Sequence, residues 1–194
     1  MTIATRRYTF DEWIDAPANT PLAELVEGIP VDRMASTFDH GQIVGELWDW
    51  LRRAQRAGFG WVSVEPVGVV LDAAGARRNV REPDLCFVRK DRAHIITGKA
   101  VEGVPDLVIE VLSPTTRDDD LPDGAKWRDY ERFGVPSYWI VDPEERTVAQ
   151  YTHTGGSFGE PVVLRDGDEL RSELFPGITL PVSALIHPWP PTGA

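Results

Sequence analysis

Cysteine is almost absent from this chain: Cys86 is the only one in 194 residues. A lone cysteine excludes a disulfide within the chain and a zinc site built from cysteines. Long apolar runs are also missing, and none approaches the roughly 20 residues that a membrane-spanning helix needs. The first ten residues lack the apolar core of a signal peptide. We therefore expect a cytoplasmic protein.

Basic residues are scarce as well. The chain has 20 Lys and Arg against 31 Asp and Glu, which gives a formal net charge of -11. This balance argues against broad, non-specific coating of a nucleic-acid backbone, which needs a basic face. Two groups of basic residues could still line a local groove, although such groups are usually solvated surface charge: Arg77, Arg78, Arg81, Arg89, Lys90, Arg92 and Lys99, and Arg52, Arg53 and Arg56.

The pattern of elements predicts one domain over residues 1–186, followed by a flexible, proline-rich tail over 187–194. Apolar residues at helical spacing predict a long helix over 40–57, and a hairpin is expected within 23–34. Further strands are expected near 61–71, 81–88, 105–112, 135–141 and 147–153. Hairpins alternate with longer connections, so we expect the α/β class, with a mixed sheet flanked by helices.

Two of these expected strands carry carboxylates where a buried strand should be apolar. Side chains alternate between the faces of a strand, so Glu82, Asp84 and Cys86 share one face and Asp106 and Glu110 share a face of the other strand. The other residues on those faces are Val88 on the first strand and Val108 and Leu112 on the second. If the two strands pair antiparallel about the middle of their connection, Asp84 lies beside Glu110.

Two carboxylates at that distance repel each other unless a cation lies between them. Hard oxygen ligands without cysteine favour Mg²⁺ or Mn²⁺ over Zn²⁺, so Asp84 and Glu110 are candidate metal ligands. The alternative is a structural ion pair with arginines on the neighbouring strands.

Lys126 is unusual for its place in the next expected helix, which Gly134 ends. Helical spacing puts Lys126, Tyr130 and Phe133 on one face, which should be the buried one. A lysine there either extends its amine to water or points at an anionic group. In the second case it could orient an attacking water beside the acidic strands.

Three other residues are weaker candidates. Glu27 could complete the site from the hairpin, or it could be a turn carboxylate. His40 begins the long helix on its apolar side, where a hydrogen-bonded structural role is favoured over that of a catalytic base. Asp106 lies roughly 13 Å from Glu110 along the strand, too far to share a metal, and a salt bridge at the start of the strand is the favoured role.

The chain resembles the Uma2 family, a group of restriction-endonuclease-like proteins of bacteria. Matching segments cover most of the chain, and the stretch over 105–143 is the most specific. They include Leu25-Val26-Glu27-Gly28, His40, Arg81-Glu82-Pro83-Asp84, Pro105-Asp106-Leu107-Val108-Ile109-Glu110-Val111-Leu112-Ser113-Pro114-Thr115-Thr116, Lys126, Tyr130, Gly134-Val135-Pro136-Ser137-Tyr138-Trp139-Ile140-Val141-Asp142-Pro143 and Leu174-Phe175-Pro176-Gly177.

The resemblance implies the PD-(D/E)xK nuclease fold, in which one strand supplies an aspartate and the next supplies an acidic residue with a lysine two positions later. Asp84 and Glu110 match the two acids. Leu112 stands where the lysine would be, so Lys126 from the following helix is the natural replacement. The family pattern also has an aspartate in the connection to that helix, and Asp120 fits it.

The implied function is a Mg²⁺- or Mn²⁺-dependent endonuclease that hydrolyses DNA phosphodiester bonds, with Asp84, Glu110 and Lys126 as its catalytic residues. The alternative is a catalytically silent nuclease-fold domain that binds nucleic acid or a protein partner. The acidic net charge and the missing in-line lysine favour this alternative. A homodimer is a further expectation, because nucleases that cut both strands commonly dimerise.

Overall fold

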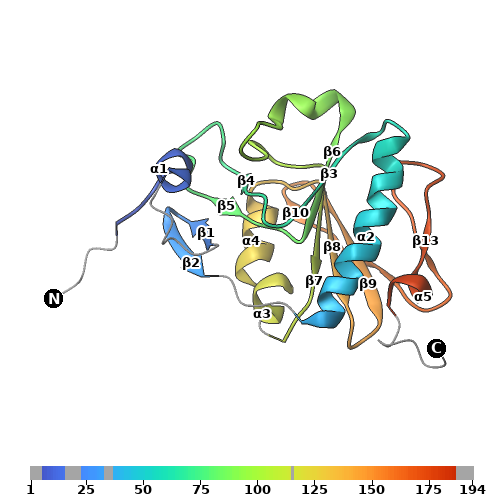
Figure 1. Ribbon diagram of the computed structural model, residues 1–194. Helices are drawn as coiled ribbons and strands as arrows, with labels where there is room; N and C mark the ends of the chain where they lie inside the picture. Colours follow the sequence, from blue (N-terminus) through green and yellow to red (C-terminus); the bar gives the residue numbers. More distant parts are fainter. Residues whose placement is uncertain (1–5, 16–22, 33–36, 115, 187–194) are drawn as a thin grey trace.

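A mixed sheet of seven strands forms the centre of the molecule (Figure 1). The computed structural model describes residues 6–15, 23–32, 37–114 and 116–186. The strand order is β10-β9-β8-β7-β6-β3, and β11 pairs with β9. The strands are β3 Gly60–Val64, β6 Leu85–Arg89, β7 Leu107–Val111, β8 Ser137–Asp142, β9 Thr147–Thr154, β10 Ser157–Phe158 and β11 Val162–Leu164.

Strands β7 and β8 are parallel, and the other neighbours in this sheet are antiparallel. A parallel pair needs a crossover connection, which here contains helices α3 Arg117–Asp120 and α4 Ala125–Arg132. All five residues of β7 are buried, as expected for a strand covered on both faces. The predicted mixed sheet with flanking helices is confirmed.

Helix α2, Phe38–Arg56, covers one face of this sheet. The Thr37 side chain accepts a hydrogen bond from the backbone of His40 and so caps the helix. The apolar stripe of α2 packs against alternate residues of β6 and β7; this core includes Ile43, Leu47, Trp50, Leu51, Phe87, Leu107 and Ile109. Helix α4 belongs to the second core, with Trp127, Tyr130, Cys86, Val108 and Tyr138. Glu110 stands between Ile109 and Val111 of the first core, so its side chain lies on the α4 face.

A second, smaller sheet has the order β2-β1-β5-β4 and was not expected as a separate sheet. Its strands are β1 Ala23–Val26, β2 Ile29–Asp32, β4 Val69–Val70 and β5 Val80–Arg81, and helix α1, Phe10–Ile14, contributes Phe10 to its core. Glu27 and Gly28 both have positive φ, which matches a tight hairpin turn between β1 and β2.

The remaining elements are the 3₁₀ helix η1 Lys90–Ile95, the strand pair β12 Glu169–Leu170 and β13 Leu180–Pro181, and helix α5 Val182–Leu185. No helix in the described ranges is both long and apolar enough to cross a membrane. The proline-rich tail over 187–194 lies outside the described residues, so the single-domain boundary at 186 stays a prediction.

Candidate active site

Asp84 and Glu110 lie side by side at one end of β6 and β7. The antiparallel register pairs Leu85 with Ile109, and one further step places Asp84 opposite Glu110. The Asp84 N–H lies 3.4 Å from Glu110 Oε2, and the Val111 N–H donates to Asp84 Oδ2 at 2.7 Å. The structure therefore has the juxtaposition that strand alternation predicts.

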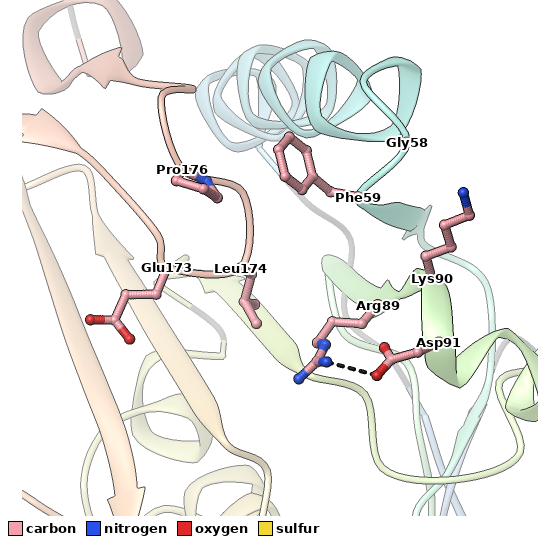
Figure 2. A pocket seen from close by; sticks show the side chains of 8 residues that line it. All are labelled: Gly58, Phe59, Arg89, Lys90, Asp91, Glu173, Leu174 and Pro176. Carbon is pink, nitrogen blue, oxygen red and sulfur yellow. Dashed lines mark hydrogen bonds and ion pairs between the residues drawn. The ribbon is translucent and has the colours of Figure 1, made fainter.

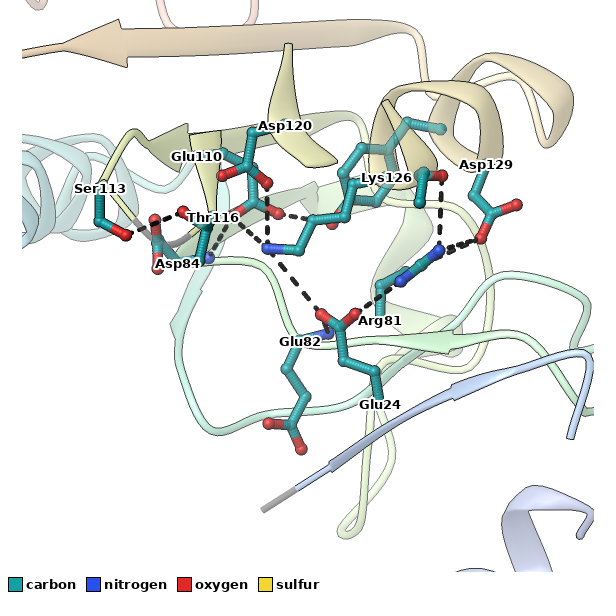
Figure 3. Close-up of polar contacts among 12 residues, drawn as sticks. Glu24, Arg81, Glu82, Asp84, Glu110, Ser113, Thr116, Asp120, Lys126 and Asp129 are labelled. Atoms are coloured by element: carbon teal, nitrogen blue, oxygen red, sulfur yellow. Dashed lines mark hydrogen bonds and ion pairs between the residues drawn. The ribbon is translucent and has the colours of Figure 1, made fainter. Parts of the chain in front are cut away.

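Lys126 on α4 points at these acids from the adjoining helix (Figure 3). Its Nζ lies 3.0 Å from Glu110 Oε2 and 3.2 Å from Asp120 Oδ1. One helical turn later, the Tyr130 hydroxyl donates to Glu110 Oε1 at 2.7 Å. Both oxygens of Glu110 are thus held by side chains of α4, and Lys126 is 7% exposed.

Glu24 on β1 joins the cluster from the small sheet. Its Oε1 lies 3.9 Å from Lys126 Nζ and accepts from the Glu82 N–H at 3.1 Å. Its Oε2 accepts from Arg81 Nη1 at 2.6 Å. The Glu82 carboxylate itself points away from Lys126 (Figure 3). Residues from both sheets and from α3 and α4 therefore build one buried cluster.

Negative charge exceeds positive charge in this cluster. Four carboxylates that are each at most 5% exposed lie around Lys126, and Arg81 pairs with the first of them: Glu24, Asp84, Glu110 and Asp120. Burial raises the pKa of Glu110 well above its usual value despite Lys126, and the charges of Asp120 and Asp84 add to the effect. Burial also raises the pKa of Asp120. The surrounding carboxylates raise the pKa of Lys126 against the opposing effect of burial, so this amine carries its charge.

His40 orients Asp84 from the first turn of α2. Its Nε2 lies 3.1 Å from Asp84 Oδ2, and both side chains are buried. Burial would raise the pKa of Asp84, but this hydrogen bond, the His40 and Lys126 charges and the Val111 N–H lower it overall. The pKa values of Asp84 and Glu110 are therefore shifted in opposite directions, so Asp84 is the more readily ionised of the two.

A protein-family model described as "Uma2: Putative restriction endonuclease" matches residues 9–183. The chain belongs to the Uma2 family. Its fold is similar to that in "Crystal structure of a putative nuclease belonging to DUF820 from Anabaena variabilis ATCC 29413", with a TM-score of 0.69 and 18% identity over 92% of this chain and 97% of that one. No curated protein matches the chain.

The weaker candidates among the residues of this Uma2 chain lie apart from the cluster, except for His40. Glu27 is in the β1–β2 turn, where its Oε1 accepts from Arg132 at 2.9 Å on the surface, apart from the buried cluster, as in the turn-carboxylate alternative. Asp106 accepts from the Arg89 N–H and from Arg92 at the opposite end of β7. Glu24, three residues before Glu27, is the glutamate that the sequence argument missed. Glu24 lies within the expected hairpin strand and Glu27 in its turn, and this difference is the signal that could have singled out Glu24.

Several members of the first basic group noted in the sequence pair with nearby acids. Arg77 pairs with Asp11 and Glu102, and Arg92 pairs with Asp106. A cavity of about 880 Å³ lies at the Arg89 end of β6, away from the cluster, and Arg89 pairs with Asp91 on its wall (Figure 2). These ion pairs reduce the positive charge that the first basic group presents.

The cluster fits a hard divalent cation by its chemistry. Its donors are oxygen atoms, its buried charge is negative in excess, and within the described chain Asp120 Oδ1 accepts no hydrogen bond in good geometry despite its ion pair with Lys126. No described group of three or more acidic, histidine or cysteine side chains forms a complete metal cage. Mg²⁺ commonly uses only one or two carboxylates and keeps several waters, so this arrangement suits it.

Proposed function

We propose that this Uma2 protein is a Mg²⁺- or Mn²⁺-dependent endonuclease that hydrolyses phosphodiester bonds in DNA. The observation that supports it most is the buried pair of Asp84 and Glu110 with the Lys126 amine 3.0 Å from Glu110 Oε2. A buried excess of carboxylates is costly unless it binds a cation. Membership of a family described as "Putative restriction endonuclease" agrees with this chemistry.

Asp84, Glu110 and the main-chain carbonyl of Val111 would hold the metal. When bound, the metal lowers the pKa of a coordinated water and stabilises charge on the phosphoryl group. Lys126 orients the attacking water and offsets negative charge that develops on the phosphate. His40 fixes the Asp84 carboxylate, and Tyr130 fixes that of Glu110.

The test is cleavage of supercoiled plasmid and of single-stranded DNA with Mg²⁺ or Mn²⁺, using the wild type and Lys126→Ala. Lys90→Ala is the matched control, because Lys90 is exposed at the far end of β6. We expect the wild type and the control to cut and Lys126→Ala to be inactive while still folded by circular dichroism. Equal cutting by all three proteins would refute the assigned role of Lys126.

A catalytically silent domain that binds nucleic acid or a protein partner is the second candidate. The net charge of -11 and the absence of lysine at position 112 favour it. Titration calorimetry with Mn²⁺ separates the two candidates, because a silent site should bind the ion weakly. Tight Mn²⁺ binding that is lost in Asp84→Asn would support the enzyme.

A further inference from the structure

Arg81 is the buried cation that the proposed chemistry leaves unused. It is 3% exposed and extends from β5 of the small sheet. Its Nη1 donates to Glu24 Oε2 at 2.6 Å, and its Nε and Nη2 donate to Asp129 Oδ2 at 2.9 and 2.6 Å. One guanidinium therefore joins β1, β5 and α4.

Helix α4 carries, within two turns, one acidic partner of Arg81 and the two side chains that donate to Glu110. Asp129 lies between Lys126 and Tyr130, which donate to opposite oxygens of Glu110. Arg81 Nη2 also reaches the carbonyl of Ala125, at 3.4 Å, at the start of the helix. A shift of α4 relative to β5 would therefore move the Lys126 amine away from Glu110.

The same guanidinium fixes Glu24. Arg81 holds Oε2, and the Glu82 N–H holds Oε1, so the carboxylate has a single orientation beside Lys126. Three residues after Arg81 comes Asp84, directly before β6 of the main sheet. One short segment thus anchors the small sheet, the helix and the acidic strand.

We propose that Arg81 is a positioning residue, which locks α4 against the small sheet and thereby holds Lys126 and Glu24 at the Glu110 carboxylate. Its effect on catalysis rests on the proposed nuclease function, whereas its effect on Lys126 does not. A simple ion pair would stabilise the fold without controlling where Lys126 lies.

The lysine content of the chain gives a direct test. Only Lys90, Lys99 and Lys126 are present, and only Lys126 is buried. In protein labelled with ¹³C and ¹⁵N at lysine, the Lys126 ammonium should give a separate, slowly exchanging NMR signal, assigned by its loss in Lys126→Met. We expect Asp129→Asn and Arg81→Gln to shift this signal and to speed its exchange with water.

The matched control is Glu102→Gln, which breaks a similar two-acid arginine bridge at Arg77. It should leave the Lys126 signal unchanged. Plasmid cleavage by Asp129→Asn should show kcat lowered about tenfold to a hundredfold at nearly unchanged KM, because misplacing a reacting group by about 1 Å has that effect.

Each outcome bears on the proposal. An unchanged Lys126 signal with a lowered melting temperature would show a structural ion pair only and overturn it, as would an equal shift in Glu102→Gln. If Asp129→Asn kept the kcat of the wild type, the proposed effect of Arg81 on catalysis would be refuted. A shifted signal in a chain that cuts no DNA would support the positioning and refute the nuclease.

Discussion

Acidic residues are buried at both ends of the paired strands β6 and β7, but their charges are paired differently at the two ends. At one end, Asp84 and Glu110 share Lys126 with Asp120 and Glu24. At the other end, Asp106 has its own arginine, Arg92, at 2.9 Å and a backbone donor at Arg89. The Arg92 side chain is 32% exposed, so this second ion pair meets water.

This difference separates a candidate site from a structural contact. A single acid with a single arginine and a backbone donor is satisfied, and it contributes only modestly to stability. A group of acids that outnumbers its cations in a dry environment stores unfavourable charge, which a bound cation can relieve. The same strand thus carries Asp106 as a structural residue and Glu110 as a candidate ligand.

The strongest way to test this comparison is to neutralise one acid at each end. Asp84→Asn should lower cleavage by about a thousandfold or more, because metal assistance contributes several kcal/mol to transition-state stabilisation. It should also remove the rise in melting temperature that we expect Mn²⁺ to cause in the wild type. Asp106→Asn should keep both properties. Equal losses in the two variants, measured by plasmid cleavage and thermal unfolding, would contradict the distinction.

Lys126→Met should combine an activity loss with a stability loss. Without the amine, the surrounding carboxylates lack their shared cation, and breaking a buried ion pair costs about 3–5 kcal/mol. Chemical denaturation at pH 7 measures this loss, and adding Mn²⁺ should restore part of it. A variant as stable as the wild type would show that the carboxylates are already protonated.

Glu110→Gln should inactivate the protein and yet stabilise it at neutral pH by about 1 kcal/mol, as removal of strained active-site groups often does. Burial raises the pKa of Glu110 on folding above the ordinary value of 4.5. The folded chain then binds the proton of the Glu110 carboxyl more tightly than the unfolded chain does. The free energy of unfolding therefore falls as the pH rises from the pKa of the unfolded chain to the higher pKa of the folded chain.

The advantage of Glu110→Gln should accordingly vanish as the pH is lowered towards 4.5. Urea denaturation of both proteins at several pH values, without added metal, measures it. A variant that is less stable than the wild type at pH 8 would show that ionised Glu110 is a net stabilising partner of Lys126.

The smallest effect is expected at the end of β7 where Asp106 has its own hydrogen-bond partners. Asp106→Asn should lower the free energy of unfolding by about 1 kcal/mol, because its ion pair is partly exposed and the backbone donor can still bond the amide oxygen. Thermal unfolding at low and high salt measures this. A loss as large as that of Lys126→Met would make both ends of the strands equally dependent on charge.

The part of the site that follows local rules was predictable. Two-residue alternation identified the faces of Asp84 and Glu110, and helical spacing put Lys126 and Tyr130 on one buried face. Glu24 and Arg81 were not predictable in this way, because their contacts depend on how two separate sheets meet. Arg81 belonged to a group of basic residues whose ordinary interpretation is surface charge, and only tertiary structure shows its burial.

The elements of the fold also divide into those set by local sequence patterns and those set by long-range pairing. The long helix and strands β7, β8 and β9 lie within a few residues of the expected bounds. The strand expected near 61–71 is divided between β3 and β4, which belong to different sheets, and only the second half of the segment expected near 81–88 is in β6. Strands β4 and β5 have two residues each, too few for any periodic signal. They exist because long-range pairing with β1 stabilises them, so the second sheet could not be inferred from the sequence.

The spread of the cluster along the chain has a consequence for biosynthesis. Its members run from Glu24 on β1, through Asp84 and Glu110, to Lys126 on α4. Translation proceeds from the N-terminus, so a chain still on the ribosome lacks the lysine until α4 has been made and has left the exit tunnel. Until then the acids have no amine to share, so the cluster is completed only late in synthesis.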